Sequence, residues 1–163
     1  MSQKIINTED LAFLLYELLD IERLTQFPRY EDHSRDTFDA AIELALKVAS
    51  ETFAPHNHAC DEDEPRFENG KVVIRPEVAE ALKVLRETGL MAASQDYERG
   101  GMQLPAAVSQ TCIGLIKGAN VSTQAYAGLT IAACNLIMAH GTDEQKKRFA
   151  EPMMAGRFFG TMC

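Results

Sequence analysis

The chain has 163 residues, of which 46% are hydrophobic and 25% are charged, and its formal net charge is −8. This length is typical of one ordinary domain, and a chain of this size buries roughly 70% of its unfolded surface without a stabilising metal or disulfide. An acidic surface repels phosphate backbones, so nucleic acid and anionic membranes are not expected as partners. The four cysteines form no C-x-x-C pair and fit no disulfide framework.

The N-terminus shows no sign of a secretory signal. The first eight residues are polar, and no small-residue cleavage site follows an apolar run. No apolar stretch reaches the roughly 18–20 residues that span a bilayer. We therefore expect a soluble protein of a reducing compartment, cytoplasmic or matrix-like, with no membrane partner.

Two amphipathic helices are predicted in the first third of the chain. The leucines at positions 11–19 follow one stripe of a helix, which Asn7 or Thr8 can cap. A second helix is expected over residues 36–52, where apolar side chains recur with helical spacing. Pro55 is expected to end it, because proline lacks the amide proton that a helix interior requires.

The middle of the chain alternates polar connections with helices. Residues 56–75 are predicted to form a long polar connection that contains an acidic run and an Asn-Gly turn dipeptide. Pro76 then opens a third helix that Gly89 ends, and Pro105 opens a fourth that Gly118 ends. A loop containing adjacent glycines connects these two helices.

The fifth helix is the most informative. It is predicted to begin at the cap Ser122 and to end near His140, and it is apolar nearly all round. Such a helix is expected in the middle of a bundle, covered by others. Gly128 lies inside it and costs about 1 kcal/mol against alanine. Either a neighbouring helix or a ligand chain that approaches the backbone closely would explain it. Thr142 and Gln145 form a capping box that begins a sixth helix.

The last seven residues differ from the rest. Phe158, Phe159, Thr161 and Met162 favour a strand, yet no second strand is evident, and a lone strand is not a stable unit. The predicted fold is therefore all-α, a bundle of about six helices over residues 1–156. Residues 157–163 are expected to be the first strand of a β domain that is not included.

Few residues suggest chemistry by themselves. The alternating His56, His58 and Cys60 suggest a metal site, and the acidic run 61–64 suggests a calcium site, but a solvent-exposed loop is the favoured interpretation of both. Gly100-Gly101 could cradle a phosphate, although a turn that needs positive φ is favoured. No nucleophile-and-base pattern or P-loop is present, so no catalytic residue and no metal site is predicted.

The order of these signals resembles the N-terminal part of the acyl-CoA dehydrogenase superfamily. Each motif is weak alone, but their order and spacing extend over roughly residues 40–163. Three features narrow the resemblance to the subgroup of methylmercaptopropionyl-CoA dehydrogenase-like enzymes. They are the extra helix before residue 30, the segment Asn69-Gly70-Lys71-Val72 and the Gly-Thr-Met-Cys sequence at residues 160–163. The matching motifs are Phe53-Ala54-Pro55, the acidic Asp61 region with Phe67, Pro76-Glu77-Val78, Leu85-Arg86-Glu87-Thr88-Gly89-Leu90, Tyr97-Glu98-Arg99-Gly100-Gly101, Gly141-Thr142-Asp143-Glu144-Gln145-Lys146-Lys147 and Gly160-Thr161-Met162-Cys163.

The resemblance implies an FAD-dependent enzyme that dehydrogenates acyl-CoA thioesters between the α and β carbons. Its subunit would have a helical, a β and a second helical domain, would pass electrons to an acceptor and would form homo-oligomers. The catalytic glutamate comes from the C-terminal domain, so the 163 residues alone are expected to be inactive. By position, the acyl pocket would include Gln124, Tyr126, Ala127 and Gly128, with Tyr97, Gly100 and Gly101 near its entrance. Met162 and Cys163 would contact the flavin.

Two other interpretations remain open. A non-catalytic helical bundle that serves as a binding or scaffold module would be stable without flavin. A relative of the flavoproteins induced by DNA alkylation would share the fold, although the net charge of −8 argues against DNA binding.

Overall fold

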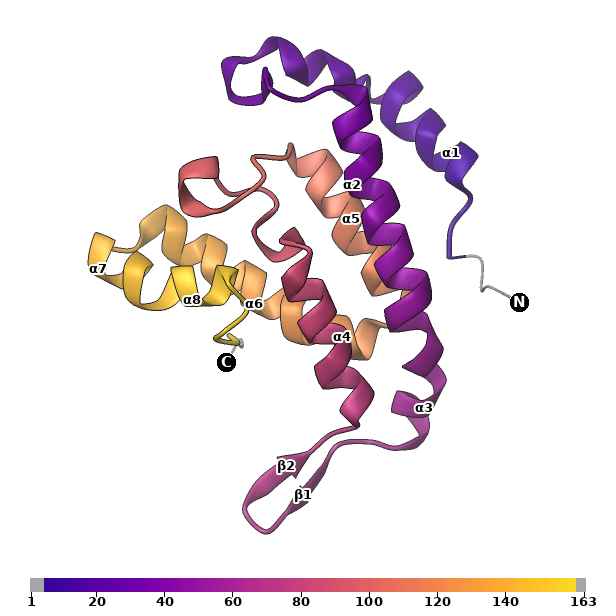
Figure 1. Cartoon of the computed structure of the whole chain (residues 1–163), viewed down its shortest axis with the longest axis vertical. Helices are drawn as coiled ribbons and strands as arrows, with labels where there is room; N and C mark the ends of the chain where they lie inside the picture. The colour runs from indigo at the N-terminus through magenta and orange to yellow at the C-terminus, as the bar shows by residue number, and fades with distance from the viewer. Residues whose placement is uncertain (1–4, 161–163) are drawn as a thin grey trace.

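The computed structural model describes residues 5–160, and these form an elongated bundle of helices with one small hairpin (Figure 1). The all-α class predicted from the sequence is confirmed. Several helices continue into short 3-10 or π turns. The elements are α1 (Thr8–Ala12), α2 (Arg35–Val48), α3 (Asn57–Glu62), β1 (Arg66–Glu68), β2 (Lys71–Val73), α4 (Pro76–Glu87), α5 (Ala106–Ala119), α6 (Val121–His140), α7 (Asp143–Gln145) and α8 (Glu151–Met154).

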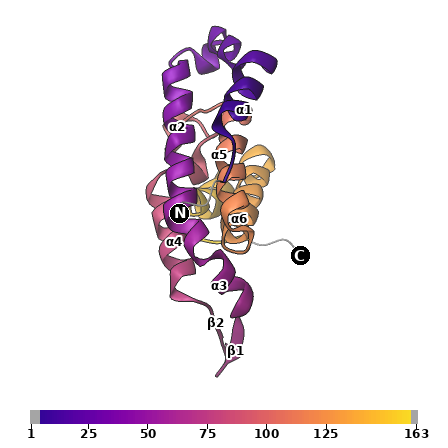
Figure 2. The same ribbon diagram turned by 90° about the vertical axis from the view of Figure 1, so that its right-hand side faces the viewer.

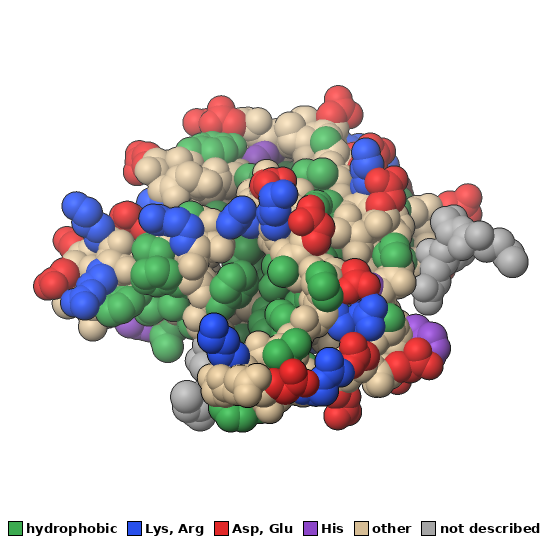
Figure 3. Space-filling view, turned by 60° about the horizontal axis from the view of Figure 1, so that its bottom comes forward, with side chains coloured by type: hydrophobic (Ala, Val, Ile, Leu, Met, Phe, Trp, Pro, Cys, Tyr) green, Lys and Arg blue, Asp and Glu red, His purple; other side chains and the backbone are tan. Residues whose placement is uncertain are grey.

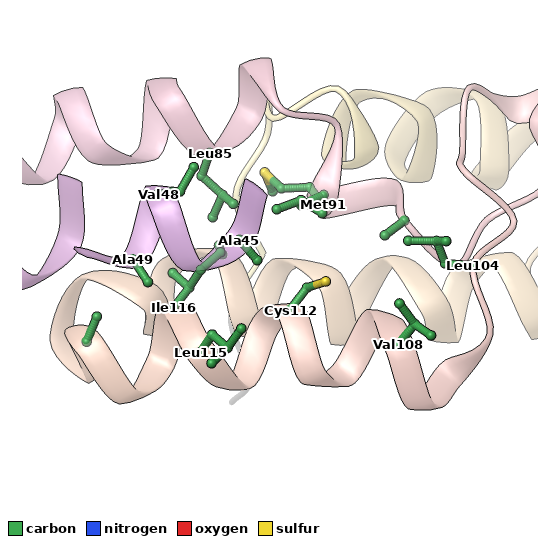
Figure 4. Packing of buried hydrophobic residues seen from close by; sticks show 14 of the residues in the cluster. Ala45, Val48, Ala49, Leu85, Met91, Leu104, Val108, Cys112, Leu115 and Ile116 are labelled. Atoms are coloured by element: carbon green, nitrogen blue, oxygen red, sulfur yellow. The ribbon is translucent and has the colours of Figure 1, made fainter. Parts of the chain in front are cut away.

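The centre of the core is the packing of α2 against α5. Small side chains on α2 let the two helices approach each other: Ala45 is fully buried opposite Cys112 and Ile116, and Ala49 is buried next to them (Figure 4). Leu85 of α4 closes this layer from the other side. Removing large buried apolar side chains from such a layer costs about 2–5 kcal/mol each, so this layer positions the helices around it.

The helix over residues 36–52 is longer than the sequence predicts, and Pro55 does not end it. The chain continues from α2 through a π turn (Ala49–Phe53) and a 3-10 turn (Ala54–His56) into α3. Proline is tolerated there because it lies in the first positions of the 3-10 turn, where its missing amide proton is not needed. The predicted connection 56–75 therefore begins with a helix.

The rest of that connection is a β-hairpin, which the sequence analysis did not predict. β1 and β2 pair antiparallel, with Phe67 opposite Val72. Asn69 and Gly70 form the turn with φ of 51° and 78°, as an Asn-Gly hairpin turn requires. The hairpin projects from the bundle below α3 and α4 (Figures 1 and 2), and Phe67 is 75% exposed.

The predicted first helix forms only in part and buries little of its leucine stripe. Asn7 caps α1, and the helix then widens into a π turn (Phe13–Leu18). Leu15 is buried, but Leu18 and Leu19 are 64% and 60% exposed. Helical periodicity therefore predicted that this segment is helical. Only one side of its row of leucines packs on α2, and the other side is exposed.

The helix α6 was expected to be covered on all sides, and within residues 5–160 it is not. Its cap is Asn120 rather than Ser122. The side chains that α6 buries are mostly polar or small, whereas Val121 and Leu136 are 54% and 64% exposed. Figure 3 shows exposed hydrophobic side chains extending toward the α7–α8 end of the molecule. One side of α6 thus packs on the bundle, and the other is an apolar surface. Its buried residues are Thr123, Gln124, Ala127, Thr130 and Cys134.

The capping box of the sixth helix is confirmed. The Thr142 hydroxyl accepts a hydrogen bond from the Gln145 amide, and the Gln145 side chain accepts one from the Thr142 amide. After α8, Gly156 adopts a φ of 62°, and residues 157–160 form no strand. An isolated segment there has no partner with which to share backbone hydrogen bonds. The remaining residues of the predicted strand, 161–163, lie outside the described part.

Candidate functional site

A groove of about 470 Å³ lies between α5 and α6. Both helices contribute one face to this α5–α6 groove, and its lining is largely apolar. The residues that line it are Gln110, Ile113, Gly114 and Lys117 of α5 and Val121, Gln124, Ala125, Gly128 and Leu129 of α6. It contains two of the four predicted acyl-pocket positions on α6. Clefts lined mostly by apolar groups with a few placed polar ones are typical ligand sites.

A buried network of hydrogen bonds holds the junction between α5 and α6, the two helices that line the groove. The Asn120 side chain accepts a hydrogen bond from the Thr123 amide (3.0 Å) and donates one to the Phe53 carbonyl (3.2 Å). The Thr123 hydroxyl also hydrogen-bonds the His56 ring (2.9 Å). Because all three side chains are at least 95% buried, leaving any of these groups unpaired would be costly. The network therefore sets where α6 begins relative to α2 and α5.

Gln124 and Gly128 lie one turn apart at the floor of the groove. An ideal Cβ on Gly128 would lie 3.0 Å from Nε2 and 3.1 Å from Oε1 of Gln124, and its three nearest atoms all belong to that side chain. The sequence left open whether a helix or a ligand approaches Gly128. The structure shows a different arrangement, because the glycine makes room for the amide of Gln124, which is 3% exposed.

The other two candidates on α6 point away from the groove. Ala127 is fully buried in the core. Tyr126 lines a separate cavity of about 120 Å³ with Cys60, Ser122 and Arg75 among its neighbours. Helix geometry explains this separation, because residues four apart share a face, whereas residues two apart lie on nearly opposite sides.

The loop that carries Tyr97, Gly100 and Gly101 lies elsewhere. The Tyr97 hydroxyl is 3.2 Å from the His33 ring, and Gln95 of the same loop donates a hydrogen bond to Asn135 (2.7 Å). Asn135 is seven residues beyond Gly128, or roughly 10 Å along the helix. The loop therefore contacts the C-terminal half of α6 and does not line the groove.

The two glycines of this loop are needed by its backbone. Gly100 has a φ of 77°, which favours glycine. A Cβ on Gly101 would collide with the Gln95 backbone carbonyl. The interpretation of Gly100-Gly101 as a turn is thus supported, with the second glycine required by close packing.

No group of metal-binding side chains is found among residues 5–160. His56 is buried and bonded to Thr123, whereas His58 is exposed on α3 beside Glu62. The prediction of an exposed loop was therefore wrong for His56, because the helix after Pro55 turns it toward α6. In the same part of the chain, no helix has the length and hydropathy needed to cross a bilayer.

Met162 and Cys163, the predicted flavin contacts, lie outside the described residues. The segment that precedes them packs on α6. The Gly160 amide donates a hydrogen bond to the Thr130 hydroxyl (3.1 Å), and that hydroxyl donates one to the Tyr126 carbonyl (2.6 Å). The last described residue is thus held against the helix that carries Gln124 and Gly128.

The α5 side of the groove was not predicted from the sequence. Ile113, Gly114 and Lys117 line it, but α5 was judged only by its buried stripe. Gly114 was the available signal: like Gly128, it lies inside a helix, and a Cβ there would meet no atom within 4 Å. A glycine on each of two adjacent helices leaves both helix surfaces without a side chain at that point, which favours a surface concavity.

The family model for the N-terminal domain of acyl-CoA dehydrogenases matches residues 36–157. This match covers α2 to α8 and both walls of the groove. The chain belongs to the acyl-CoA dehydrogenase N-terminal domain family. The resemblance proposed from the motifs is therefore confirmed, and only the segment before Asp36, with α1, precedes the match.

Two curated relatives of this acyl-CoA dehydrogenase domain are each 30% identical to it. One is a butyryl-CoA dehydrogenase of Syntrophomonas wolfei, aligned over 94% of this chain and 26% of the relative. The other is a 3-methylmercaptopropionyl-CoA dehydrogenase of Ruegeria pomeroyi, aligned over 87% of this chain and 25% of the relative. The chain thus spans about a quarter of the length of these relatives.

Proposed function

We propose that this domain forms one wall of the acyl pocket of an FAD-dependent acyl-CoA dehydrogenase. The observation that carries the proposal is the α5–α6 groove, in which a largely apolar lining surrounds Gln124 and Gly128. An apolar groove suits a short acyl chain because both surfaces leave water when they meet. The dehydrogenase names of the two relatives support this assignment.

Within the complete enzyme, bound FAD would accept the β-hydride of the acyl group. The part of this domain would be to orient the chain and to exclude water, which positions the α and β carbons for reaction. Gly128 has no side chain, so the Gln124 amide is the only side-chain group over this part of the helix and the groove stays open. Of the seven positions expected to meet the substrate, we retain Gln124 and Gly128 for this role.

The exposed apolar side of the domain supports a place inside a larger assembly. Leu136 and Phe159 are 64% and 49% exposed, and exposed apolar patches of this kind mark interfaces. Because the relatives are about four times as long as this chain, we propose that further domains cover this surface. Contacts with further copies and with an electron acceptor belong to the same proposal.

The test uses the protein produced from its complete gene. We expect it to carry flavin and to reduce an electron-accepting dye with butyryl-CoA. Gly128→Leu should raise KM for butyryl-CoA at least about tenfold, because the new side chain fills the groove. Ala139→Leu is the matched control, since Ala139 is exposed at the end of α6 and lies outside the groove. A flavin-free protein that oxidises no acyl-CoA would refute the enzyme assignment and favour a scaffold module.

A further inference from the structure

A second groove, of about 330 Å³, lies between the first helical segment of the chain and α2. One wall is the N-terminal arm, residues 8–18, which comprises α1 and the π turn that follows it. This α1–α2 groove shares no lining residue with the α5–α6 groove, and the arm precedes the family match, which begins at residue 36. The lining residues are Thr8, Leu11, Ala12, Leu15 and Tyr16 of the arm and Asp39, Ile42, Glu43 and Leu46 of α2.

The shape and the apolar lining of the α1–α2 groove suit one side of another helix. Leucine and isoleucine side chains from both walls line it, and the apolar surface continues along the arm, where Phe13, Leu14 and Leu18 are exposed. The arm extends over roughly 16 Å, or three helical turns. An amphipathic helix binds such a groove through apolar side chains spaced three or four residues apart. Exposed apolar surface of this kind marks sites of protein interaction.

The charged side chains around this groove are mostly acidic. The arm contains no lysine, arginine or histidine. Arg35 of α2 stacks on the Tyr16 ring at 4.0 Å and lies 3.7 Å from the Asp39 carboxylate, so this cation is already paired. The exposed acidic residues are Glu9, Asp10 and Glu17 of the arm and Glu43 of α2. None of these four forms an ion pair within residues 5–160, which leaves the edges of the groove negatively charged.

We propose that the α1–α2 groove is the docking site of a partner protein that presents a basic amphipathic helix. The apolar side of that helix fills the groove, and its lysine or arginine side chains reach the acidic edges, where opposite charges attract and orient the partner. A second copy of this chain fits less well, because a symmetric contact would place the same acidic edges against each other. An anionic membrane is repelled for the same reason. The inference is independent of the acyl pocket.

The probe for the experiment is a fluorescein-labelled helical peptide of about 14 residues, with leucines on one side and lysines on the other. Fluorescence anisotropy measures its binding to the protein produced from its complete gene. We expect saturable binding that weakens as salt is raised, because salt screens the exposed charges. A second peptide with the same leucines and with glutamate in place of every lysine should bind at least about tenfold more weakly.

Two double variants locate the binding site. Glu17→Lys combined with Glu43→Lys reverses the charge on both walls of the groove, and it should raise Kd for the lysine peptide at least about tenfold. Glu87→Lys combined with Glu144→Lys is the matched control. These residues are exposed on α4 and α7, so the control gives the same net charge and should change Kd by less than about twofold.

Several results would overturn the proposal. One is the absence of saturable binding of the lysine peptide, and another is equal binding of the glutamate peptide, which would show apolar adhesion only. An unchanged Kd in the Glu17–Glu43 double variant would place the peptide on another surface. A dimer that this variant dissociates, with no peptide binding, would show that a second copy covers the groove. If the variant does not fold, the comparison of the two peptides on the natural protein still decides.

Discussion

The imidazole of His56 and the hydroxyl of Thr123 lie 2.9 Å apart in the interior, although 67 residues separate them in the chain. This contact joins the end of the long helical segment after α2 to the first turn of α6. Both side chains are at least 95% buried, and the Asn120 cap lies three residues before Thr123. The position of the groove wall thus depends on a polar contact rather than on apolar packing alone.

Replacing His56 should therefore destabilise the domain. We expect His56→Ala to lower the free energy of unfolding by about 2–3 kcal/mol, because it leaves a cavity and an unpaired Thr123 hydroxyl. His58→Ala is the matched control, since the His58 side chain is 83% exposed, and it should change stability by less than about 0.5 kcal/mol. Urea denaturation measures both; equal effects would contradict the buried role of His56.

Gly128 and Gly156 should respond in opposite ways to alanine. Gly128→Ala meets only the end of a flexible side chain, so the gain in helix propensity should leave stability unchanged or raised by up to about 1 kcal/mol. Gly156 has a φ of 62° and would press on the side chain of Arg86, so Gly156→Ala should lower stability by about 1–2 kcal/mol. Thermal unfolding compares them, and a destabilised Gly128→Ala would indicate close helix packing there.

The buried cysteines should react slowly with thiol reagents. Burial raises the pKa of the Cys112 thiol to about 11 and also raises the pKa of Cys134. Only thiolates react rapidly, and both residues are buried, whereas Cys60 is partly accessible. Iodoacetamide at pH 8 followed by peptide mass analysis should therefore show Cys60 modified well before the other two. Faster modification of Cys112 would show that the α2–α5 layer opens readily.

The same thiol should make the domain less stable in base. The Cys112 pKa is higher in the folded chain than its ordinary value of 9.0, so the unfolded chain loses this proton first as pH rises. Stability from this group is complete below pH 9 and declines between pH 9 and about 11, by roughly 1 kcal/mol per pH unit. Urea denaturation at several pH values should show this decline in the natural protein and a smaller one in Cys112→Ala. Equal pH profiles would disprove the linkage.

The exposed apolar side of α6 should make the 163-residue chain bind hydrophobic dyes and self-associate. Leu136 is 64% exposed, and Leu136→Lys should reduce both dye fluorescence and the fraction of oligomers at little cost in stability. Light scattering and dye titration measure the two effects. A monodisperse monomer that binds no dye would show that this surface is too small to matter.

Local sequence signals predicted most helices, and chain-distant contacts account for the differences. The predicted helices over 36–52, from Pro76 and from Pro105 all form, because their spacing and end residues act within a few positions. The hairpin was missed, although its Asn-Gly turn was visible, because its three-residue strands are too short to show alternation. For the candidate site, two of the four acyl-pocket candidates on α6, Gln124 and Gly128, line the α5–α6 groove, while Tyr126 and Ala127 do not.

The sequence by itself determined the family, the helical class, the Asn7 cap and the Thr142–Gln145 capping box, since motifs and caps of this kind depend on neighbouring residues. The tertiary structure alone decided which side of α6 is buried. Apolar residues occur on nearly all sides of that helix, so its sequence pattern does not indicate which side faces the bundle. The His56–Thr123 and Asn120–Phe53 hydrogen bonds select one, because pairing these buried groups requires their side of the helix to face the bundle. The groove at Gln124 follows from that choice.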